Sequence, residues 1–552
     1  MTSAGAAQGS KRAGSLAAEP FALRQVKEAA QALLAQGKVE EAFEFFTSAL
    51  EAVLRKSREM ELLLLKLQKE RLGTRSERVD PAQLQMLFEE LVRQGGPEPL
   101  PDLEAEARED AELDQQIEEA EEAQGQGKGP RVKRGGEAKV KVDGVERKVH
   151  HVEVPESERE CAECGETKKK IGEDVTTRLE YVPAHFVEHE DHLDKYACPK
   201  CREGVTTAKG PERVIERSPA DATLLAHVVV SKYVDHCPLH RLHNIYGRSG
   251  ALLPVSTLSD WAGEVADLLK PLTDKLEERV LGAYVIRTDA TGVKVLDPSS
   301  PENIERGTMW CYVGDDRDVI FRYTPTGEGA TGPWEFLRGR TGYVQADAAS
   351  VFDRVYNGQV ASALEVGCWA HARRRLVDLQ DMDCRVAYPL KLIGRLYRIE
   401  HLADAKDLST TQRTSLRKQR SQGLLERLKR WLVTTHGSEP PSADLTKATA
   451  YILNQWVALT RFVEDGRLSL DNNNCESQLR AIALGRRNYL FCGSHKAAGR
   501  AAVLYGITRT CAQYNVPPLP YLTDVLRKLA ASWPQSRLED ILPDRWQAPN
   551  TQ

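Results

Sequence analysis

Apolar and polar residues alternate through much of residues 283–370, and this pattern predicts a β-sheet. Residues 283–297 and 308–326 together predict three short strands, with turn signals at Gly292–Lys294 and Gly314–Asp318. A fourth strand is predicted at residues 342–350 and a fifth at residues 365–370. The fifth strand leads into a helix with the sequence HARRRLVDL. We therefore expect a mixed sheet of five strands flanked by helices.

Two further regions have the periodicity of helices. Residues 27–54 resemble one helical hairpin of the tetratricopeptide type with Gly37 at its turn, and residues 387–464 are helical in composition. The second helix of the hairpin continues with positions spaced by four and three, broken only by a serine: Phe46, Leu50, Val53, Ser57, Met60, Leu64 and Leu67. This spacing predicts a coiled-coil seam through which two chains dimerise, although an amphipathic helix packed on its own domain fits equally well.

A pair of helices is predicted before the sheet. Residues 221–250 and 255–272 are helical in pattern, and Ser256 is a natural N-cap for the second helix. The arrangement suits a helix-turn-helix that presents Thr257 and Ser259 to DNA. A plain helical spacer is equally compatible with the pattern.

Charge is uneven along the chain although the net charge is only −5. Residues 101–125 hold eleven acidic side chains and one basic side chain, whereas residues 126–148 hold eight basic and three acidic ones. This composition predicts a solvated linker. The basic half is suited to phosphate contact, but solubility alone accounts for it more simply. With no apolar run of about 18 residues and no apolar signal region, we expect a cytoplasmic protein without a membrane span.

Four of the eleven cysteines have the spacing of a metal site. They form two C-x-x-C pairs, Cys161 with Cys164 and Cys198 with Cys201. Two such knuckles close a tetrahedral Cys₄ site for one Zn²⁺ ion. The histidines between the pairs are expected at the surface, because four thiolates already saturate the metal: His185, His189 and His192.

Three acidic residues occupy positions that suit a two-metal site. Asp289 and Asp347 end strand-like runs, and Glu476 lies in the first turn of a later helix. That helix carries three arginines suited to phosphate: Arg480, Arg486 and Arg487. Mg²⁺ is held by a few carboxylates plus substrate oxygens, and two such ions activate an attacking hydroxyl and stabilise the leaving oxygen. The chain has 81 Asp and Glu residues, so spacing alone also allows an arbitrary trio.

The nearest competitor for the second position is Asp353. It follows Asp347 by about 1.7 helical turns in a predicted helix, so its carboxylate should point elsewhere, toward solvent. The stretch CWAHARRR offers another candidate group. We expect His371 beside the carboxylates, bonded to phosphate or a metal-bound water, and an ordinary strand-to-helix junction is equally compatible. The arginines that follow would contact the DNA backbone: Arg373, Arg374 and Arg375.

From about Leu62 to Leu526 the chain resembles the transposases of the insertion sequence 66 family, bacterial D-D-E transposases. The stretches that carry the resemblance are residues 72–91, the paired C-x-x-C block, and residues 231–263, 286–297, 342–350, 365–378, 393–400 and 471–511. The resemblance implies that Asp289, Asp347 and Glu476 are the catalytic triad and bind Mg²⁺ or Mn²⁺. The chain departs from the family at Ala290, where Glu is usual, and at Ser477, where a basic residue is commoner.

The resemblance also implies a multidomain α+β fold. The expected parts are a helical and coiled-coil region (1–93), a charged linker (94–150), a zinc ribbon (151–212), a helix-turn-helix-like DNA-binding segment (213–278), a ribonuclease H-like α/β core (279–512) with a helical insertion (about 387–464), and a helical tail (513–552). The implied activity is cleavage at the ends of a mobile element and transfer of the 3′ hydroxyl into target DNA. Alternatives are a catalytically inactive zinc-containing DNA-binding protein and a nuclease that only hydrolyses.

The expected partners follow from that activity. They are double-stranded DNA, as terminal repeats and as target, and a second copy of the chain in at least a dimer on DNA. Accessory proteins of the element are further candidates, and no membrane is involved. A cytoplasmic, nucleoid-associated location follows.

Overall fold

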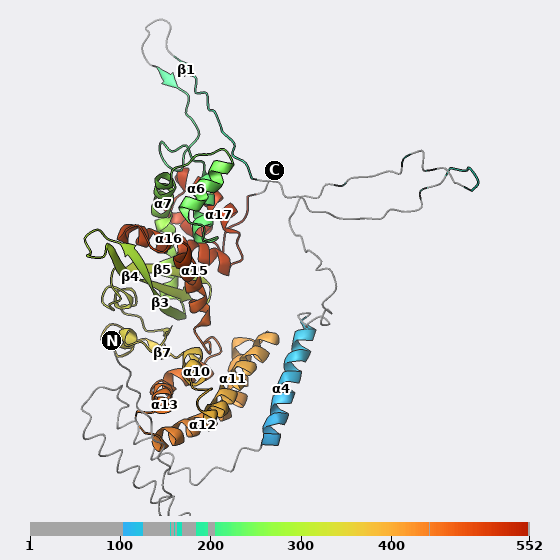
Figure 1. Ribbon diagram of the computed structural model, residues 1–552, viewed down its shortest axis with the longest axis vertical. Helices are drawn as coiled ribbons and strands as arrows, with labels where there is room; N and C mark the ends of the chain where they lie inside the picture. Colours follow the sequence, from blue (N-terminus) through green and yellow to red (C-terminus); the bar gives the residue numbers. More distant parts are fainter. Residues whose placement is uncertain are drawn as a thin grey trace, which may run out of the picture. The chain divides into compact units, whose positions relative to one another are not determined.

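The computed structural model describes residues 103–124, 205–440 and 442–549, with only short stretches between residues 125 and 204 (Figure 1). The predicted N-terminal hairpin and its seam lie outside the described residues, as do three of the four zinc-site cysteines: Cys161, Cys198 and Cys201. All contacts described below lie within one compact unit, Pro97–Val433 with Tyr451–Gln552. Among the described helices, none combines the length and the apolar character needed to cross a membrane.

A five-stranded mixed sheet forms the centre of this unit, as the sequence predicts. Its strands are β3 (Val285–Leu296), β4 (Ile304–Gly314), β5 (Asp318–Thr324), β6 (Tyr343–Gln345) and β7 (Leu364–Val366). Their order across the sheet is β5-β4-β3-β6-β7. β4 pairs antiparallel with both β3 and β5, whereas β6 lies parallel to both β3 and β7. The long strand β3 therefore stands at the boundary between the antiparallel and the parallel half.

One of the two predicted turns is wrong. β3 continues through Gly292–Lys294, because its pairing with β4 runs without a break from Ile286 to Leu296. Val293 and Val295 on this stretch are buried in the core, so the alternation continues past the glycine. The turn predicted at Gly314–Asp318 is confirmed. There two aspartates adopt positive φ, which Asp tolerates better than most residues: Asp315 (45°) and Asp316 (65°).

Helices from both ends of the chain cover the sheet. The elements are α5 (Ala222–Tyr233), α6 (Leu239–Arg248) and α7 (Val255–Gly282) from before it, and α15 (Asn473–Tyr489), α16 (His495–Gln513), α17 (Pro518–Ala530) and η5 (Gln535–Ile541) from after it. One hydrophobic core joins these helices to β3, β4 and β5, and Figure 1 shows α6 and α7 beside α16 and α17. The sequence predicts two helices before the sheet, whereas the structure has three. All three pack into the hydrophobic core of the sheet.

The N-cap predicted at Ser256 is wrong. α7 begins at Val255 with Pro254 as its N-cap, and Ser256 is an exposed residue of the first turn. Proline suits this position because it lacks the N–H that a helix start leaves unpaired. Leu258 and Trp261 of α7 are buried in the core, whereas Ser259 is exposed.

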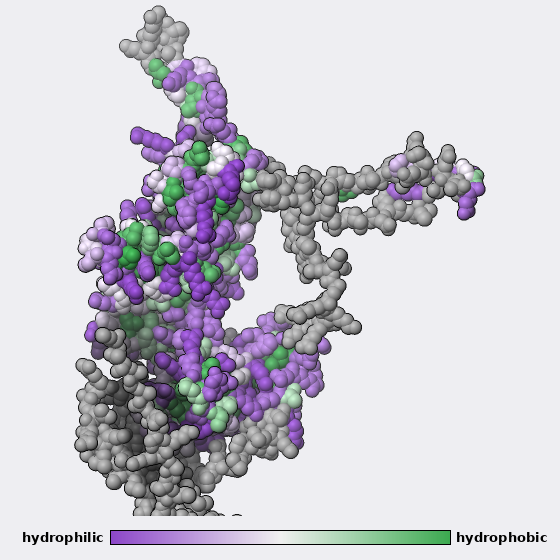
Figure 2. All heavy atoms as spheres, viewed as in Figure 1, coloured by the Kyte–Doolittle hydropathy of each residue, from purple (hydrophilic) through white to green (hydrophobic). Residues whose placement is uncertain are grey.

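Helices fill the region between the last strand and α15, as its composition predicts. They are α10 (Trp369–Val377), α11 (Ala387–Ala405), α12 (Thr410–Ser438), α13 (Asp444–Asn454) and α14 (Trp456–Thr460). Short elements complete the described chain: β1 (Lys195–Tyr196), β2 (Thr206–Thr207), α8 (Pro333–Phe336), η2 (Ser350–Phe352), α9 (Asp353–Tyr356), η3 (Cys384–Val386) and η4 (Arg461–Val463). On the face drawn in Figure 2 the described residues are mainly hydrophilic, with hydrophobic residues in small groups.

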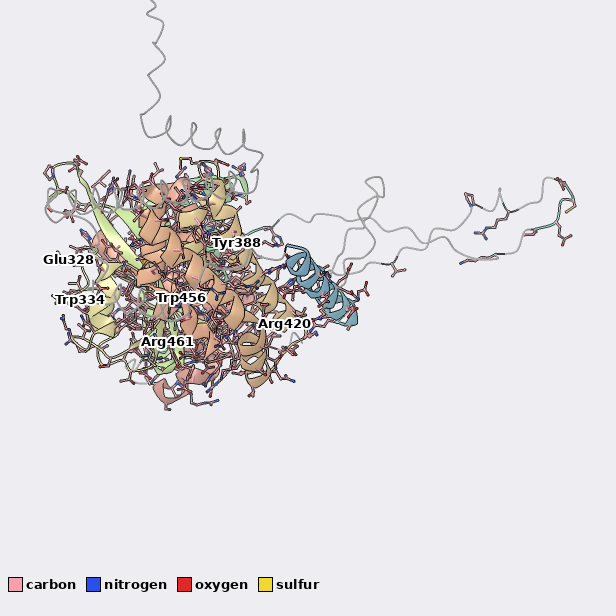
Figure 3. All side chains as sticks on the ribbon, turned by 90° about the horizontal axis from the view of Figure 1, so that it is seen from below. Glu328, Trp334, Tyr388, Arg420, Trp456 and Arg461 are labelled. Atoms are coloured by element: carbon pink, nitrogen blue, oxygen red, sulfur yellow. The ribbon has the colours of Figure 1, made fainter. Side chains whose placement is uncertain are left out.

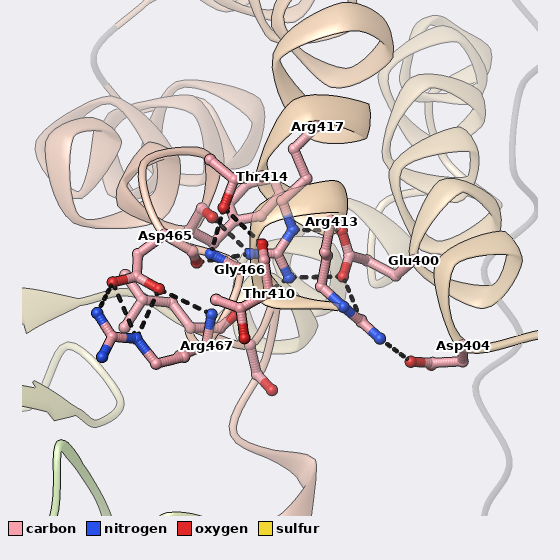
Figure 4. A network of polar contacts seen from close by, with 12 residues as sticks. Glu400, Asp404, Thr410, Arg413, Thr414, Arg417, Asp465, Gly466 and Arg467 are labelled. Carbon is pink, nitrogen blue, oxygen red and sulfur yellow. Dashed lines mark hydrogen bonds and ion pairs between the residues drawn. The ribbon is translucent and has the colours of Figure 1, made fainter. Parts of the chain in front are cut away.

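A buried arginine ties α12 to the loop that leads to α15 (Figure 4). Arg417 has 1% of its side chain exposed and makes a two-point contact with Glu400, at 2.8 and 2.6 Å. It also donates to the backbone carbonyls of Phe462, Asp465 and Leu468 at 2.6 to 2.9 Å. A planar guanidinium is suited to such a site because it directs several donors at once. The network therefore fixes the path of the chain into α15.

The prediction of a solvated linker is wrong for its acidic half. Residues Leu103–Ala123 form helix α4, which contacts α11. Its buried apolar residues, Leu113, Ile117 and Ala120, recur at spacings of four and three, which places them on one helical face. Acidic residues of α4 pair with basic residues of the other helices, so the excess charge is partly neutralised within the fold.

Candidate active site

The parallel pairing of β3 and β6 brings two of the predicted carboxylates together. Arg287 of β3 is in register with Gln345 of β6, where β6 ends. Asp289 and Asp347 follow these partners by two residues each, so both lie just beyond the last paired residues of the neighbouring strands β3 and β6. The prediction that Asp289 ends a strand is wrong. Asp289 lies inside β3, because β3 continues along β4 to Leu296. On the side of β3 that faces β6, Asp289 has no strand partner among the described residues, because the pairing of β3 with β6 ends at Arg287 and Gln345.

The third carboxylate approaches from α15. Glu476 lies in the first turn of this helix, as predicted, and 24% of its side chain is exposed. The pKa of Asp289 is raised to about 6, mainly by burial and also by the negative charges of Asp347 and Glu476, against the lowering effects of the Ala290 N–H and of His371. The Ala290 N–H donates to Asp289 Oδ1 at 2.7 Å. The negative charges of Asp347 and Glu476 thus act on Asp289.

A buried asparagine fixes the start of α15 against the sheet. Asn472, the N-cap of α15, donates from Nδ2 to the carbonyl of Thr288 at 2.9 Å, next to Asp289 in the chain. Its backbone N–H donates to Cys368 Sγ at 3.3 Å, at the start of α10. Asn472 is fully buried. One residue therefore connects the elements that carry Asp289 and Glu476.

A second buried layer supports the carboxylates from below. Arg287 Nε donates to Gln345 Oε1 at 3.0 Å, and Arg287 Nη2 donates to Ser469 Oγ at 2.9 Å. Gln345 Nε2 donates to the carbonyls of Gly367 and Ser469, both at 3.0 Å. Sequence reasoning missed these residues. The available signal was a polar residue two positions before each aspartate, directly after a buried apolar residue of the strand.

His371 joins the site, as the sequence suggests. It lies on α10, and its Nδ1 is 3.5 Å from Glu476 Oε1, with 23% of the side chain exposed. In the part of the chain that the structure describes, neither of these two atoms has a hydrogen-bond partner. Cys368 lies close enough for one ligand atom of each residue to fall within 4.8 Å of the others. Burial raises the pKa of the Cys368 thiol to about 11, so it remains protonated and accepts the Asn472 N–H.

The carboxylate oxygens of the site fit the metal that the family resemblance implies, Mg²⁺ or Mn²⁺. Asp289, Asp347 and Glu476 offer hard carboxylate oxygens, the ligands that Mg²⁺ and Mn²⁺ prefer. The buried Glu476 Oε1 without a partner is an acceptor that a cation or its water would satisfy.

The arginines predicted to contact DNA differ in their surroundings. Arg480 and Arg487 of α15 are exposed, as are Arg373 and Arg374 of α10. Arg486 instead donates to Thr291 Oγ1 at 3.0 Å and to the carbonyl of Gly292, so it holds α15 against β3. The Arg375 guanidinium lies 4.8 Å from the centre of the Tyr451 ring.

Asp353 is exposed, as predicted, although the continuous helix expected around it is not formed. A 3₁₀ turn, η2, precedes the short helix α9, and Asp353 is the first residue of α9. Partial burial raises the pKa of Asp353, and no carboxylate of the site contributes to this shift.

Comparison with known proteins identifies the family. Residues 217–500 match the family described as "Transposase IS66 family". Residues 158–202 match a domain described as "zinc-finger binding domain of transposase IS66", and this range includes all four predicted zinc ligands. The chain belongs to the IS66 transposase family, and the resemblance found in the sequence is confirmed. The zinc-finger match supports Zn²⁺ as a bound metal.

Relatives in Sinorhizobium fredii (strain NBRC 101917 / NGR234) cover most of the chain. Uncharacterized protein y4hP is 30% identical over 431 residues, which is 73% of this chain and 76% of the relative. Uncharacterized protein y4qI is 31% identical over 411 residues, which is 72% of this chain and 75% of the relative. These relatives are named without an activity, and the family assignment is shown by the match over residues 217–500.

Proposed function

We propose that this transposase is a metal-dependent D-D-E enzyme that cuts DNA at the ends of a mobile element and joins the exposed 3′ hydroxyl to target DNA. Asp289, Asp347 and Glu476 are the proposed catalytic residues. The observation that carries the proposal is their placement. Asp289 and Asp347 each follow by two residues the register pair Arg287–Gln345 of parallel strands β3 and β6. Asn472 holds the start of the helix that carries Glu476 against Thr288. Three carboxylates at the edge of a sheet are costly to keep together unless a cation joins them.

The sheet supports a ribonuclease H-like core. Three antiparallel strands followed by two parallel ones, in the order β5-β4-β3-β6-β7, are the arrangement we propose for that core. The long chain segment between Asp347 and Glu476 is then the helical insertion. The Arg417 network and Asn472 support this interpretation, because they return the chain to the sheet at the third carboxylate.

The residues of the chain have separate roles in the proposed reaction. Bound Mg²⁺ or Mn²⁺ would supply charge stabilisation for the attacking and leaving oxygens of the phosphodiester. His371, beside Glu476, would hold a water or a phosphate oxygen. The exposed arginines would bind the DNA backbone from two helices: Arg373, Arg374, Arg480 and Arg487. Arg486 holds the helix that carries Glu476 and so has a positioning role.

The parts outside the site complete the proposal. Cys161, Cys164, Cys198 and Cys201 would hold one structural Zn²⁺ in a module that helps to recognise the terminal repeats, which the zinc-finger match supports. The predicted N-terminal seam would hold two protomers together, because joining requires two ends of the element.

A cleavage and joining reaction tests the proposed function. The purified full chain is incubated with DNA that carries the ends of its element and with a circular target, in Mg²⁺. We expect nicks that expose a 3′ hydroxyl and products in which this end is joined to the target, and chelation should remove both. Nicking without joined products would favour a nuclease, and binding without either would favour an inactive DNA-binding protein.

A further inference from the structure

Acidic helix α4 lies against a row of basic side chains on the helical insertion. We call these side chains the basic face: Lys391, Arg395, Arg398 and His401 of α11, with Arg420 and Arg427 of α12. Those of α11 recur at spacings of four and three, so they form one stripe along the helix. Figure 1 shows α4 beside α11, and Figure 3 shows it beside Arg420.

Asp110 is the centre of this contact. It accepts a hydrogen bond from Arg395 Nε at 2.6 Å, pairs with Arg398, and lies 3.7 Å from Lys391 Nζ. Burial alone would raise the pKa of Asp110, but the hydrogen bond from Arg395 and the three nearby positive charges bring it below its usual value. The Arg395 side chain is only 4% exposed, so α4 shields its charge from solvent.

Other polar pairs extend the contact in both directions. Glu109 lies 3.6 Å from Arg395 and 4.0 Å from Arg427. The remaining pairs are Asp114 with Arg398 (3.5 Å), Glu121 with His401 (3.2 Å) and Gln116 with Arg420 (2.9 Å). α4 thus presents acceptor oxygens to five cationic residues and a histidine along one helix.

The apolar part of the contact is small. Among residues 108–123, the part of α4 whose burial the structure describes, the buried hydrophobic residues are Leu113, Ile117 and Ala120. The far half of the helix borders a cavity of about 480 Å³ that is lined on the other side by Ala405 and Leu408. Glu109 and Asp114 are 64% and 60% exposed, and exposed ion pairs are weak and screened by salt. The contact between α4 and the basic face is therefore held mainly by charge. Another anion can displace α4 from such a contact.

A phosphate backbone is the anion that matches the basic face. Arginine binds phosphate and carboxylate with the same bidentate geometry, and a row of such side chains binds the regularly charged DNA backbone. We propose that the basic face binds the backbone of double-stranded DNA, and that α4 is an internal acidic competitor which occupies this face until DNA displaces it. The identity of the polymer rests on the proposed function, but the inference is independent of catalysis.

Two matched sets of substitutions test the inference in the full chain with Asp289→Asn, which leaves DNA uncut. The face variant carries Glu109→Gln, Asp110→Asn and Glu121→Gln. The control carries Glu112→Gln, Glu118→Gln and Glu122→Gln, the same change of charge on exposed residues of α4 that have no ion pair with the basic face among the described residues. The probe is a short duplex of unrelated sequence, and binding is titrated at several KCl concentrations.

The face variant should bind the duplex about tenfold or more tightly, because each weakened pair changes the competition by a factor of roughly two to five. The control should change by less than about twofold. The dependence of affinity on salt should steepen in the face variant, since phosphates then replace counterions and not carboxylates. Adding Arg398→Gln and Arg420→Gln to the face variant should remove the gain.

Hydrogen exchange gives a second readout that needs no substitution in α4. Duplex DNA should quicken exchange in residues 103–123, because an isolated helix of this length is only marginally stable. Equal affinities of the face variant and the control, or exchange in α4 that DNA leaves unchanged, would identify the contact as permanent packing and overturn the inference. The absence of duplex binding by every variant would overturn it as well. Failure of the joining reaction alone would refute the proposed function and leave these ratios unaffected.

Discussion

The neutral substitution Asp289→Asn should stabilise the metal-free protein at neutral pH while it abolishes activity. Asp289 is held among other carboxylates in a half-buried position, so its ionised form is unfavourable without a cation. Asparagine has the same shape and retains an acceptor for the Ala290 N–H. The substitution therefore removes an unfavourable charge and keeps the local hydrogen bond.

The size of the effect follows from the pKa. A rise from 3.8 to about 6 is roughly two units, or about 3 kcal/mol at 1.36 kcal/mol per unit, and partial exposure reduces this to about 1–3 kcal/mol. Because the folded-state pKa is the higher one, the folded protein binds more protons than the unfolded chain between about pH 4 and pH 6. The free energy of unfolding of the wild type should therefore decrease as the pH rises from about 4 to about 6. The decrease should be smaller in Asp289→Asn.

Urea unfolding at pH 4.5 and pH 7.5, in chelator, measures the difference. We expect Asp289→Asn to exceed the wild type by about 1–3 kcal/mol at pH 7.5 and by much less at pH 4.5. Adding Mg²⁺ should raise the stability of the wild type and not that of the variant, because ligand binding favours the folded state. The exposed control Asp381→Asn should behave as the wild type. A variant that is less stable than the wild type at pH 7.5 would refute the raised pKa of Asp289.

Three other results test the surrounding structure. Arg417→Met should lower the free energy of unfolding by about 2–4 kcal/mol in urea titrations, because it leaves Glu400 with Arg413 alone and removes the donor to the carbonyls of Phe462, Asp465 and Leu468, and a loss below about 1 kcal/mol would contradict the role of this network. Cys161→Ser should release one Zn²⁺ per chain in elemental analysis and unfold the zinc module, since structural zinc supplies the folding free energy of small units, and a metal-free but fully folded preparation would contradict this. Deletion of residues 1–75 should lower the mass in light scattering or weaken the paired-end complex, and an unchanged mass with and without DNA would exclude the seam.

The strands of the sheet and the start of the helix that carries Glu476 were predictable because their signals are local. Alternation of apolar residues marks the strands of the sheet, and the residues around Glu476 mark the start of a helix. The error at Gly292–Lys294 has the same origin. A glycine followed by polar residues indicates a turn locally, whereas the pairing with β4 that keeps β3 extended is a long-range property.

The residues that hold the site in place were not predictable, because their contacts join parts of the chain that are far apart in the sequence. Asn472 donates to the carbonyl of Thr288, 184 residues away, and α4 finds Arg395 across 285 residues. Residues 101–125 have the composition of a solvated chain, and only partners distant in the sequence make part of them a packed helix. Long-range pairing of charges leaves no pattern in a single sequence.

Strand transfer from a pre-cut element end tests the central claim most directly. The substitutions Asp289→Asn, Asp347→Asn and Glu476→Gln are assayed in Mg²⁺ beside Asp353→Asn, an exposed acid that does not contribute to the pKa of Asp289. End binding is measured on the same preparations. We expect each of the first three to lose joining by about a thousandfold or more with binding within about twofold, as removal of a metal ligand implies, and Asp353→Asn to retain most activity. Substantial joining by any of the three variants, or its loss in Asp353→Asn alone, would contradict the assignment of the active site.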